Sequence, residues 1–237
     1  MNLVDIRQRE DEIIGLIDKL ADANNGRYPI YDGIVDIEQY LNAKYKILFV
    51  LMEPYDQRDG SGGRWHIRDL FSKGGYGKSS NTFYPLIYIA YGILNDFCLW
   101  NDMNYVQDDF DEMNNHLYKI AYINISKLPA IKPPRTKFSD IVAAYKKDRA
   151  NDSIILKQID AYQPDIVIGF GIRDILYHDL AFYQPEGKSY WKSEKHPNLI
   201  YIKTYHPNQS EIFQQEFVDS VINSAKQYLT ADKFQNP

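Results

Sequence analysis

The sequence has little cysteine and no long apolar run, and each absence excludes a class of protein. The single cysteine, Cys98, cannot form a disulfide within the chain or build a cysteine-rich metal or iron–sulfur site. No apolar stretch reaches membrane-spanning length, and the charged N-terminus lacks the apolar core of a signal peptide. These features predict a cytoplasmic protein.

Internal repeats and low-complexity linkers are also absent from the 237 residues, and 44% of the residues are hydrophobic. A chain of this length and composition can bury a substantial core. We therefore expect one domain over residues 1–237, with a helical N-terminal part at 1–40 and a tail that frays over 230–237.

Short apolar runs alternate with segments of helical periodicity along the chain. The runs predict buried strands at 47–52, 120–125, 164–170 and 199–204. Helices are expected at 3–22, 83–98, 139–162 (with a possible break) and 211–229, and a long glycine-rich loop at 57–81. Strands separated by helices indicate an α/β fold with a mostly parallel sheet, whose ligands bind at the carboxyl ends of the strands.

Each predicted strand ends in a polar or conformationally special group. These groups are Glu53-Pro54-Tyr55-Asp56, Asn124-Ile125-Ser126-Lys127, Gly169-Phe170-Gly171, and the loop from Tyr205 to Ser210 that contains His206 and Asn208. Loops are generally polar, and proline and glycine commonly end elements, so any one of these ends has an ordinary explanation. Four such ends together favour a functional edge.

Charge is unevenly distributed, although the net charge is −5. Residues 126–150 carry seven bases against two acids, and residues 58–80 carry five against two, whereas residues 1–40 and 95–119 are acidic. The basic stretches follow the first two strands, so they either contact a phosphate backbone or form solvated loops. The candidate backbone contacts are Arg58, Arg64, Lys127, Lys132, Arg135 and Ser210.

The ordered strand ends resemble those of the uracil-DNA glycosylase superfamily. Glu53-Pro54-Tyr55 stands where that family has Asp-Pro-Tyr, Asn124 ends the second strand, and His206-Pro207-Asn208 stands where the family has His-Pro-Ser. The segment 163–169 also resembles the third strand of the family. The resemblance covers residues 45–228 in the family's order, and the single cysteine excludes the iron–sulfur branch.

This resemblance implies a three-layer α/β/α sandwich around a short, mostly parallel four-stranded sheet. It also implies cleavage of the bond between base and sugar without metal or cofactor, on DNA that is single- or double-stranded. Such enzymes flip the target nucleotide into a pocket and read its polar edge. The sequence does not distinguish DNA from RNA or define the base.

Three residues are the candidate catalytic groups. Glu53 would stabilise a cationic sugar and hold the attacking water, His206 would donate to the departing base, and Asn124 would pair with the edge of a pyrimidine. The alternatives are that Glu53 caps the following loop, that Asn124 bonds to backbone at a strand end, and that His206 is a turn residue. The candidate substrate-binding residues are Pro54, Tyr55 (whose ring would exclude a 5-methyl group), Phe71 or Phe83 (one of which would stack on the base), and Asn208.

The chain departs from the family pattern at two of these places. Glu53 is one methylene longer than the aspartate of the family, and the His206 loop continues Asn208-Gln209-Ser210 without the leucine that wedges into the base stack. Two other hypotheses therefore stand beside a uracil glycosylase. One is a nucleic-acid-binding module of the same fold without catalysis, and the other is a protein that binds or converts nucleosides or nucleotides.

Overall fold

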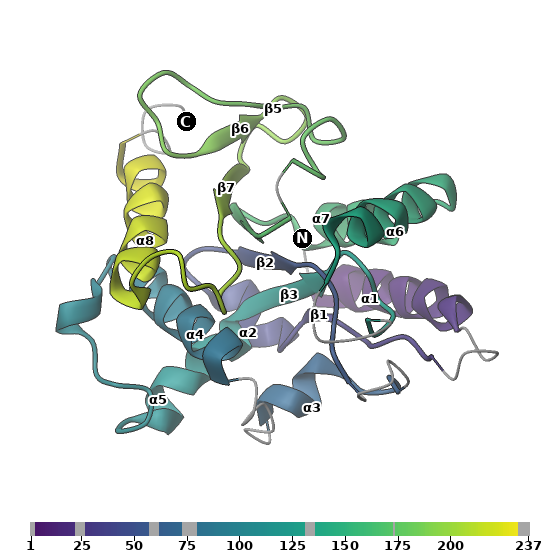
Figure 1. The fold of residues 1–237 in the computed structure, drawn as a ribbon, viewed down its shortest axis with the longest axis horizontal. Helices are drawn as coiled ribbons and strands as arrows, with labels where there is room; N and C mark the ends of the chain where they lie inside the picture. Colours follow the sequence, from purple (N-terminus) through teal and green to yellow (C-terminus); the bar gives the residue numbers. More distant parts are fainter. Residues whose placement is uncertain are drawn as a thin grey trace.

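The protein is an α/β domain in a computed structural model that describes residues 3–21, 27–56, 62–72, 80–130, 136–172 and 174–231 (Figure 1). The strands are β1 (Gly33–Ile34), β2 (Ile47–Leu51), β3 (Ile120–Asn124), β4 (Ile166–Phe170), β5 (Phe182–Tyr183), β6 (Trp191–Ser193) and β7 (Ile200–Thr204). The α-helices are α1 (Leu3–Ile17), α2 (Ile37–Asn42), α3 (Ile67–Ser72), α4 (Ser80–Leu94), α5 (Phe110–Asn114), α6 (Phe138–Ala150), α7 (Ile154–Tyr162) and α8 (Gln214–Ala231). Short 3₁₀ helices lie at η1 (Asp18–Leu20), η4 (Trp100–Asp102) and η5 (Asn115–Lys119).

The four strands expected from the sequence form the parallel centre of the sheet. The sheet order is β1-β3-β2-β4-β7-β6-β5, and β3, β2, β4 and β7 are parallel neighbours. Every residue of β2, β3 and β4 is buried. Such strands are continuous apolar runs because both faces of a parallel sheet are covered, and this is the signal that located them.

Helices cover both faces of this sheet (Figure 1). On one face α4 and α8 pack together over a core that includes Phe49, Tyr122 and Phe217. On the other face α1 and α7 pack together over Leu48 and Ile123. Alternate residues of one strand supply the two cores, as the pleat of a strand requires.

The prediction of a four-stranded sheet was wrong, because the sheet has seven strands and is mixed. The strands β1, β5 and β6 have two or three residues each and join as antiparallel edges. Strands this short carry no periodic pattern and form only because a longer neighbour offers free backbone groups. The added antiparallel strands do not change the parallel centre, so the carboxyl ends of its four strands lie together as predicted.

The prediction of one long loop at 57–81 was also wrong, because α3 lies within it. Ile67 and Phe71 of this helix are buried in the core, and Arg68 Nε donates to the carbonyl of Ile34 at 2.9 Å. A six-residue helix is too short to be stable by propensity alone, so tertiary contacts decide its formation. Residues 57–61 and 73–79 lie outside the described part of the chain.

The other expected helices are present with shifted ends. The expected break in 139–162 lies between α6 and α7, where Ser153 caps α7 by accepting from Leu156 N at 3.1 Å. At the C-terminus α8 extends to Ala231, and residues 232–237 lie outside the described chain. Among the described residues, no helix has both the length and the apolar character needed to cross a membrane.

Candidate functional site

Glu53, Asn124 and His206 all lie at the carboxyl end of the parallel strands, Asn124 as the last residue of β3, Glu53 two residues after β2 and His206 two residues after β7. Asn124 is in register with Leu51, and Ile125 N and Ser126 N donate to the carbonyls of Leu51 and Met52, each at 2.9 Å. Asn124 therefore ends β3 directly beside the β2 end that continues into Glu53. The parallel order then places the ends of β4 and β7 on the far side of β2.

Gly171 packs between Met52, which precedes Glu53, and the His206 loop. It follows β4, has φ of +70°, and donates its N–H to the carbonyl of Thr204 at 2.9 Å. A Cβ atom at this position would collide with the Met52 side chain and touch His206. Met52 and His206 thus both pack close to Gly171. The positive φ and this close packing explain the glycine after β4.

The Asn124 side chain is buried without a hydrogen-bond partner. It is 1% exposed, and neither its carboxamide oxygen nor its nitrogen bonds to any described residue. Burial raises the pKa of the neighbouring Tyr122, and the Asn124 amide partly opposes that rise, yet no hydrogen bond of ordinary geometry joins the two side chains. A buried amide without partners is destabilising and rare, so this one requires an explanation.

Aromatic rings line the face of β3 on which Asn124 lies. By strand alternation Asn124 shares this face with Tyr122, whose ring centroid is 5.9 Å from that of Phe71 and 6.0 Å from that of Phe83. Phe71 and Phe83 are themselves in edge contact at 5.3 Å, and both are buried. The Asn124 amide therefore shares a face of β3 with a tyrosine that packs against Phe71 and Phe83. The choice of Phe71 or Phe83 for base stacking stays a prediction.

Glu53 lies half-buried in the turn after β2. Burial raises its pKa, whereas a hydrogen bond with Thr136 lowers it, the nearby Asp140 raises it further and the Arg27 guanidinium lowers it. The turn is anchored to the segment after β3, because Ala130 N donates to the carbonyl of Pro54 at 2.9 Å. This carboxylate is partly desolvated and held beside a hydroxyl, an environment that favours a base over a simple surface charge.

Of the other residues of this turn, Tyr55 and Asp56 are exposed. Tyr55 is 47% exposed, and its hydroxyl lies 2.7 Å from Thr136 Oγ1, so one threonine contacts both Glu53 and Tyr55. Asp56 anchors the following loop, since its Oδ2 accepts from Gly63 N at 2.7 Å and Trp65 Nε1 at 3.2 Å. Pro54 is buried.

His206 is half-buried, and its loop fixes its tautomer. Asn208 N donates to His206 Nδ1 at 3.2 Å, so Nδ1 is the acceptor and a neutral ring carries its proton on Nε2. Burial lowers the pKa of His206, which favours that neutral ring. Asn208 and Ser210 are exposed, and Pro207 between them and the histidine is buried. The loop therefore presents a neutral N–H donor.

We expect ¹⁵N NMR of His206 to show the neutral Nε2–H tautomer at pH 7. Because burial lowers the pKa, the ring should remain mostly neutral at pH 6.5, where an ordinary histidine is half protonated. A proton on Nδ1 of His206, or a doubly protonated ring at pH 6.5, would contradict the expectation.

A polar groove of about 390 Å³ adjoins the His206 loop. Carboxamides dominate its lining, which consists of Asn81, Tyr84, Gln107, Pro207, Asn208, Gln209, Ile212 and Gln214. Gln209 also shapes the loop itself, because its Oε1 accepts from Ile212 N at 3.0 Å. A neutral lining of amides with one tyrosine suits polar uncharged groups, such as base edges, better than it suits phosphates.

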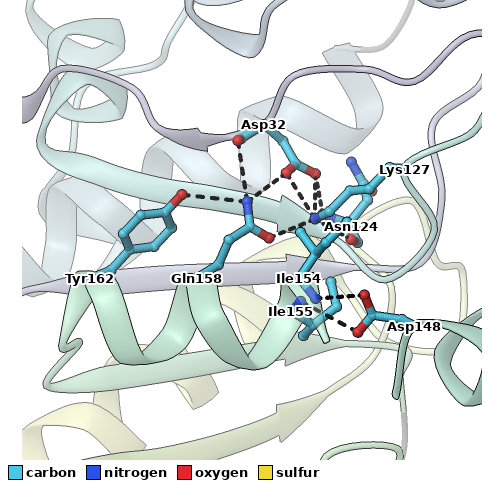
Figure 2. A network of polar contacts seen from close by, with 8 residues as sticks. All are labelled: Asp32, Asn124, Lys127, Asp148, Ile154, Ile155, Gln158 and Tyr162. Atoms are coloured by element: carbon cyan, nitrogen blue, oxygen red, sulfur yellow. Dashed lines mark hydrogen bonds and ion pairs between the residues drawn. The ribbon is translucent and has the colours of Figure 1, made fainter. Parts of the chain in front are cut away.

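The structure corrects the expectation that Lys127 contacts a phosphate backbone. Its side chain is 2% exposed and forms an ion pair with Asp32, with 2.8 Å between Nζ and Oδ1. Nζ also donates to the Asn124 carbonyl at 2.7 Å and to Gln158 Oε1 at 2.8 Å, so it has no contact left for a phosphate (Figure 2). Lysine is seldom buried, and nothing in the local sequence signals that this one is.

Of the remaining candidate backbone contacts, two are described. Arg64 is exposed, has φ of +64°, and its guanidinium lies 3.5 Å from the centroid of the Tyr28 ring. Ser210 is exposed on the His206 loop. Arg58, Lys132 and Arg135 lie outside the described residues. In the part of the chain that is described, no cluster of three or more histidine, cysteine or carboxylate side chains is placed to hold a metal ion.

Several polar residues around the site were not predicted. Thr136 and Arg27 lower the pKa of Glu53. Asp32 and Gln158 form hydrogen bonds with Lys127 beneath Asn124. Asp32 and Gln158 are 126 residues apart in sequence, and neither belongs to a recognisable motif. Only the tertiary structure brings them together.

The described geometry combines a desolvated carboxylate, an unpartnered buried amide and a neutral imidazole donor on one edge of a parallel sheet. Such a set can bind the polar edge of a planar ring and stabilise opposite charges on two sides of a breaking bond. In comparisons with known proteins, no protein-family model matches this chain, and no curated protein matches it significantly.

Proposed function

We propose that this chain is a DNA glycosylase-like hydrolase that excises uracil or a related damaged base flipped out of DNA. The observation that carries the proposal is the side chain of Asn124, a buried amide whose two polar atoms have no partner among the described residues, on the strand end in register with Leu51, two residues before Glu53. A buried donor and acceptor on one rigid group match the adjacent acceptor and donor on the edge of a uracil ring.

The three groups have distinct roles in the proposed reaction. The bond between the sugar C1′ and the base nitrogen breaks, and its electron pair leaves on the base. His206 Nε2–H donates to the base oxygen on which this charge accumulates, and the Glu53 carboxylate stabilises the cationic sugar. Water then forms the new bond to C1′ and passes its proton to Glu53. The atoms balance without a metal or cofactor.

The fold is consistent with this proposal at a coarser level. Helices on both faces of the parallel centre support the three-layer α/β/α arrangement that the resemblance to uracil-DNA glycosylases implies. The exposed Arg64 and Ser210 are the described groups that we assign to the DNA backbone. We assign the carboxamide groove beside His206 to a nucleotide that neighbours the flipped base, because its lining is neutral.

A second candidate is binding or hydrolysis of a free nucleoside or nucleotide at the same site. The observation that favours it is the burial of Lys127, which removes one positive charge from the presumed DNA-binding set. The same amide, carboxylate and imidazole would serve a base attached to a single sugar.

The test is incubation of the protein with oligonucleotides that contain one uracil, single- and double-stranded, followed by alkaline cleavage at abasic sites. We expect cleavage at uracil, none in the matched thymine oligonucleotide, and an affinity for DNA that weakens with salt. Release of uracil from deoxyuridine alone would favour the second candidate. DNA binding without abasic sites would favour a binding module without catalysis. The absence of both DNA binding and cleavage would refute the proposal.

A further inference from the structure

A buried polar network lies directly beneath Asn124, on the side of the sheet that α7 covers (Figure 2). The Asp32 and Lys127 side chains are 0% and 2% exposed and form its centre. Gln158 of α7 accepts from Lys127 Nζ and donates to Asp32 Oδ1 at 3.0 Å. Gln158 Nε2 also reaches the hydroxyl of Tyr162, one turn further along α7, at 3.4 Å.

The network forms hydrogen bonds with both main-chain polar groups of Asn124. Asn124 N donates to Asp32 Oδ2 at 2.7 Å, and the Asn124 carbonyl accepts from Lys127 Nζ at 2.7 Å. β1 pairs with β3 only through Gly33 and Ile34, so it has ended before it reaches Asn124. Asp32 and Lys127 thus replace the hydrogen bonds that a longer edge strand would have made.

An ion pair is a costly way to satisfy two backbone groups. Removing both charges from water is unfavourable, and apolar residues of similar size are often as stable or more stable in such places. The cost of burial is evident at Lys127, because burial lowers the pKa of its ammonium group while the neighbouring Asp32 raises it. Stability of the core does not explain the pair, which makes a role in the site the better explanation.

The Asn124 side chain needs such a support. Its carboxamide lies on the opposite face of β3 from the network and has no hydrogen-bond partner among the described residues that would fix its orientation. With both main-chain groups fixed, the direction of the bond from Cα to Cβ is fixed as well. An unsupported strand end would let the residue turn until its amide found water or backbone.

We propose that Asp32 and Lys127 are positioning residues that hold the Asn124 carboxamide ready for the edge of the ligand. The inference rests on the proposed function, since it assigns Asn124 to ligand binding. Gln158 acts one step further away by orienting the pair from α7. Reactions depend steeply on such placement, because a displacement of about 1 Å can cost on the order of 10²-fold in rate.

Two double variants separate positioning from charge and from stability. In Asp32→Leu/Lys127→Met the pair becomes apolar and the main-chain groups of Asn124 and the amide of Gln158 lose their partners. We therefore expect a lower melting temperature together with a loss of uracil excision of about 10²-fold in the folded protein. In Asp32→Asn/Lys127→Gln the charges disappear but an acceptor and a donor remain for the Asn124 backbone. We expect this variant to recover most of the lost kcat. The surface pair variant Asp96→Asn/Lys44→Met removes an exposed ion pair of 2.6 Å between the segment before β2 and the turn after α4, and it should change neither property.

Full excision by the folded apolar pair would overturn the inference while leaving the proposed function intact. If the apolar pair does not fold, Gln158→Met decides, because it removes the hydrogen bonds that tie Asp32 and Lys127 to α7 while the two charges remain paired. We expect it to fold and to lose about tenfold in kcat. Wild-type kcat in folded Gln158→Met would overturn the inference.

A readout independent of activity keeps the inference testable if the protein excises no base. The side-chain amide signal of Asn124 can be assigned in ¹⁵N-asparagine-labelled protein as the one missing from Asn124→Leu. We expect one sharp pair of signals in wild type and in the neutral polar variant, and broadened or multiple signals in the apolar variant. Identical sharp signals in all three would refute positioning, whatever the enzyme assay shows.

Discussion

Glu53→Gln is expected to lower uracil excision by about 10² to 10⁴-fold, the usual contribution of a positioned general base. The amide keeps the size and the contact with Thr136 but has no negative charge for the sugar cation and no site for the proton of water. Binding of uracil-containing DNA should change little, because the polar edge of the base is assigned to Asn124. Single-turnover rates and DNA affinity, measured side by side, check both statements.

The matched control for this variant is Glu53→Asp. Aspartate keeps the charge and is the residue that the resembling family has at this position, so measurable excision should remain. Glu53→Gln should fold, since burial raises the pKa of Glu53 and the ionised form therefore weakens the folded state at neutral pH. Glu53→Asp keeps the same charge as the wild type. Full excision by Glu53→Gln, with an unchanged melting temperature, would show that the carboxylate has no part in the chemistry.

The same raised pKa sets the expected pH dependence. Because the base must be ionised to act, the rate should fall as pH drops through the pKa of Glu53, and this fall should begin at a higher pH than for an ordinary glutamate. In Glu53→Gln the residual rate should lose that limb. A wild-type profile that stays flat down to the ordinary glutamate pKa would contradict the assigned role.

Asn124→Leu is expected to raise stability while it removes activity. The buried amide has no partner, and an unsatisfied polar group of this kind costs about 1 to 3 kcal/mol. Leucine has a similar volume and suits the neighbouring Phe71, Phe83 and Tyr122 rings. We therefore expect a higher free energy of unfolding in urea, together with a loss of excision on the order of 10²-fold or more.

Asn114→Leu is the matched control for the stability measurement. Asn114 is also a buried asparagine, at 6% exposure, but it takes part in a polar or ring interaction, so the substitution should destabilise the protein. Residues that bind a ligand often lower the stability of the unbound protein, because their polar groups have no partner until the ligand is present. If Asn124→Leu destabilised the protein as Asn114→Leu does, Asn124 would be an ordinary structural residue.

The sequence alone was sufficient to locate the parallel centre and the carboxyl ends of its strands, where we place the proposed site. Buried strands covered on both faces are continuous apolar runs, and the carboxyl ends of parallel neighbours lie together whatever the side chains are. The placement of Glu53, Asn124 and His206 along one edge follows from that rule. The order of the motifs, which depends on no single residue, gave the strongest functional signal.

The tertiary structure alone decided the short elements and the polar network. β1, β5, β6 and α3 are too short to form without neighbours, so no local pattern announces them. Lys127 appeared to be a surface cation and is a buried ion-pair partner of Asp32, which is 95 residues away. Burial and partnership depend on what the rest of the chain places around a residue. For the same reason, the unpartnered amide of Asn124, on which the proposed function depends, is visible only in the folded protein.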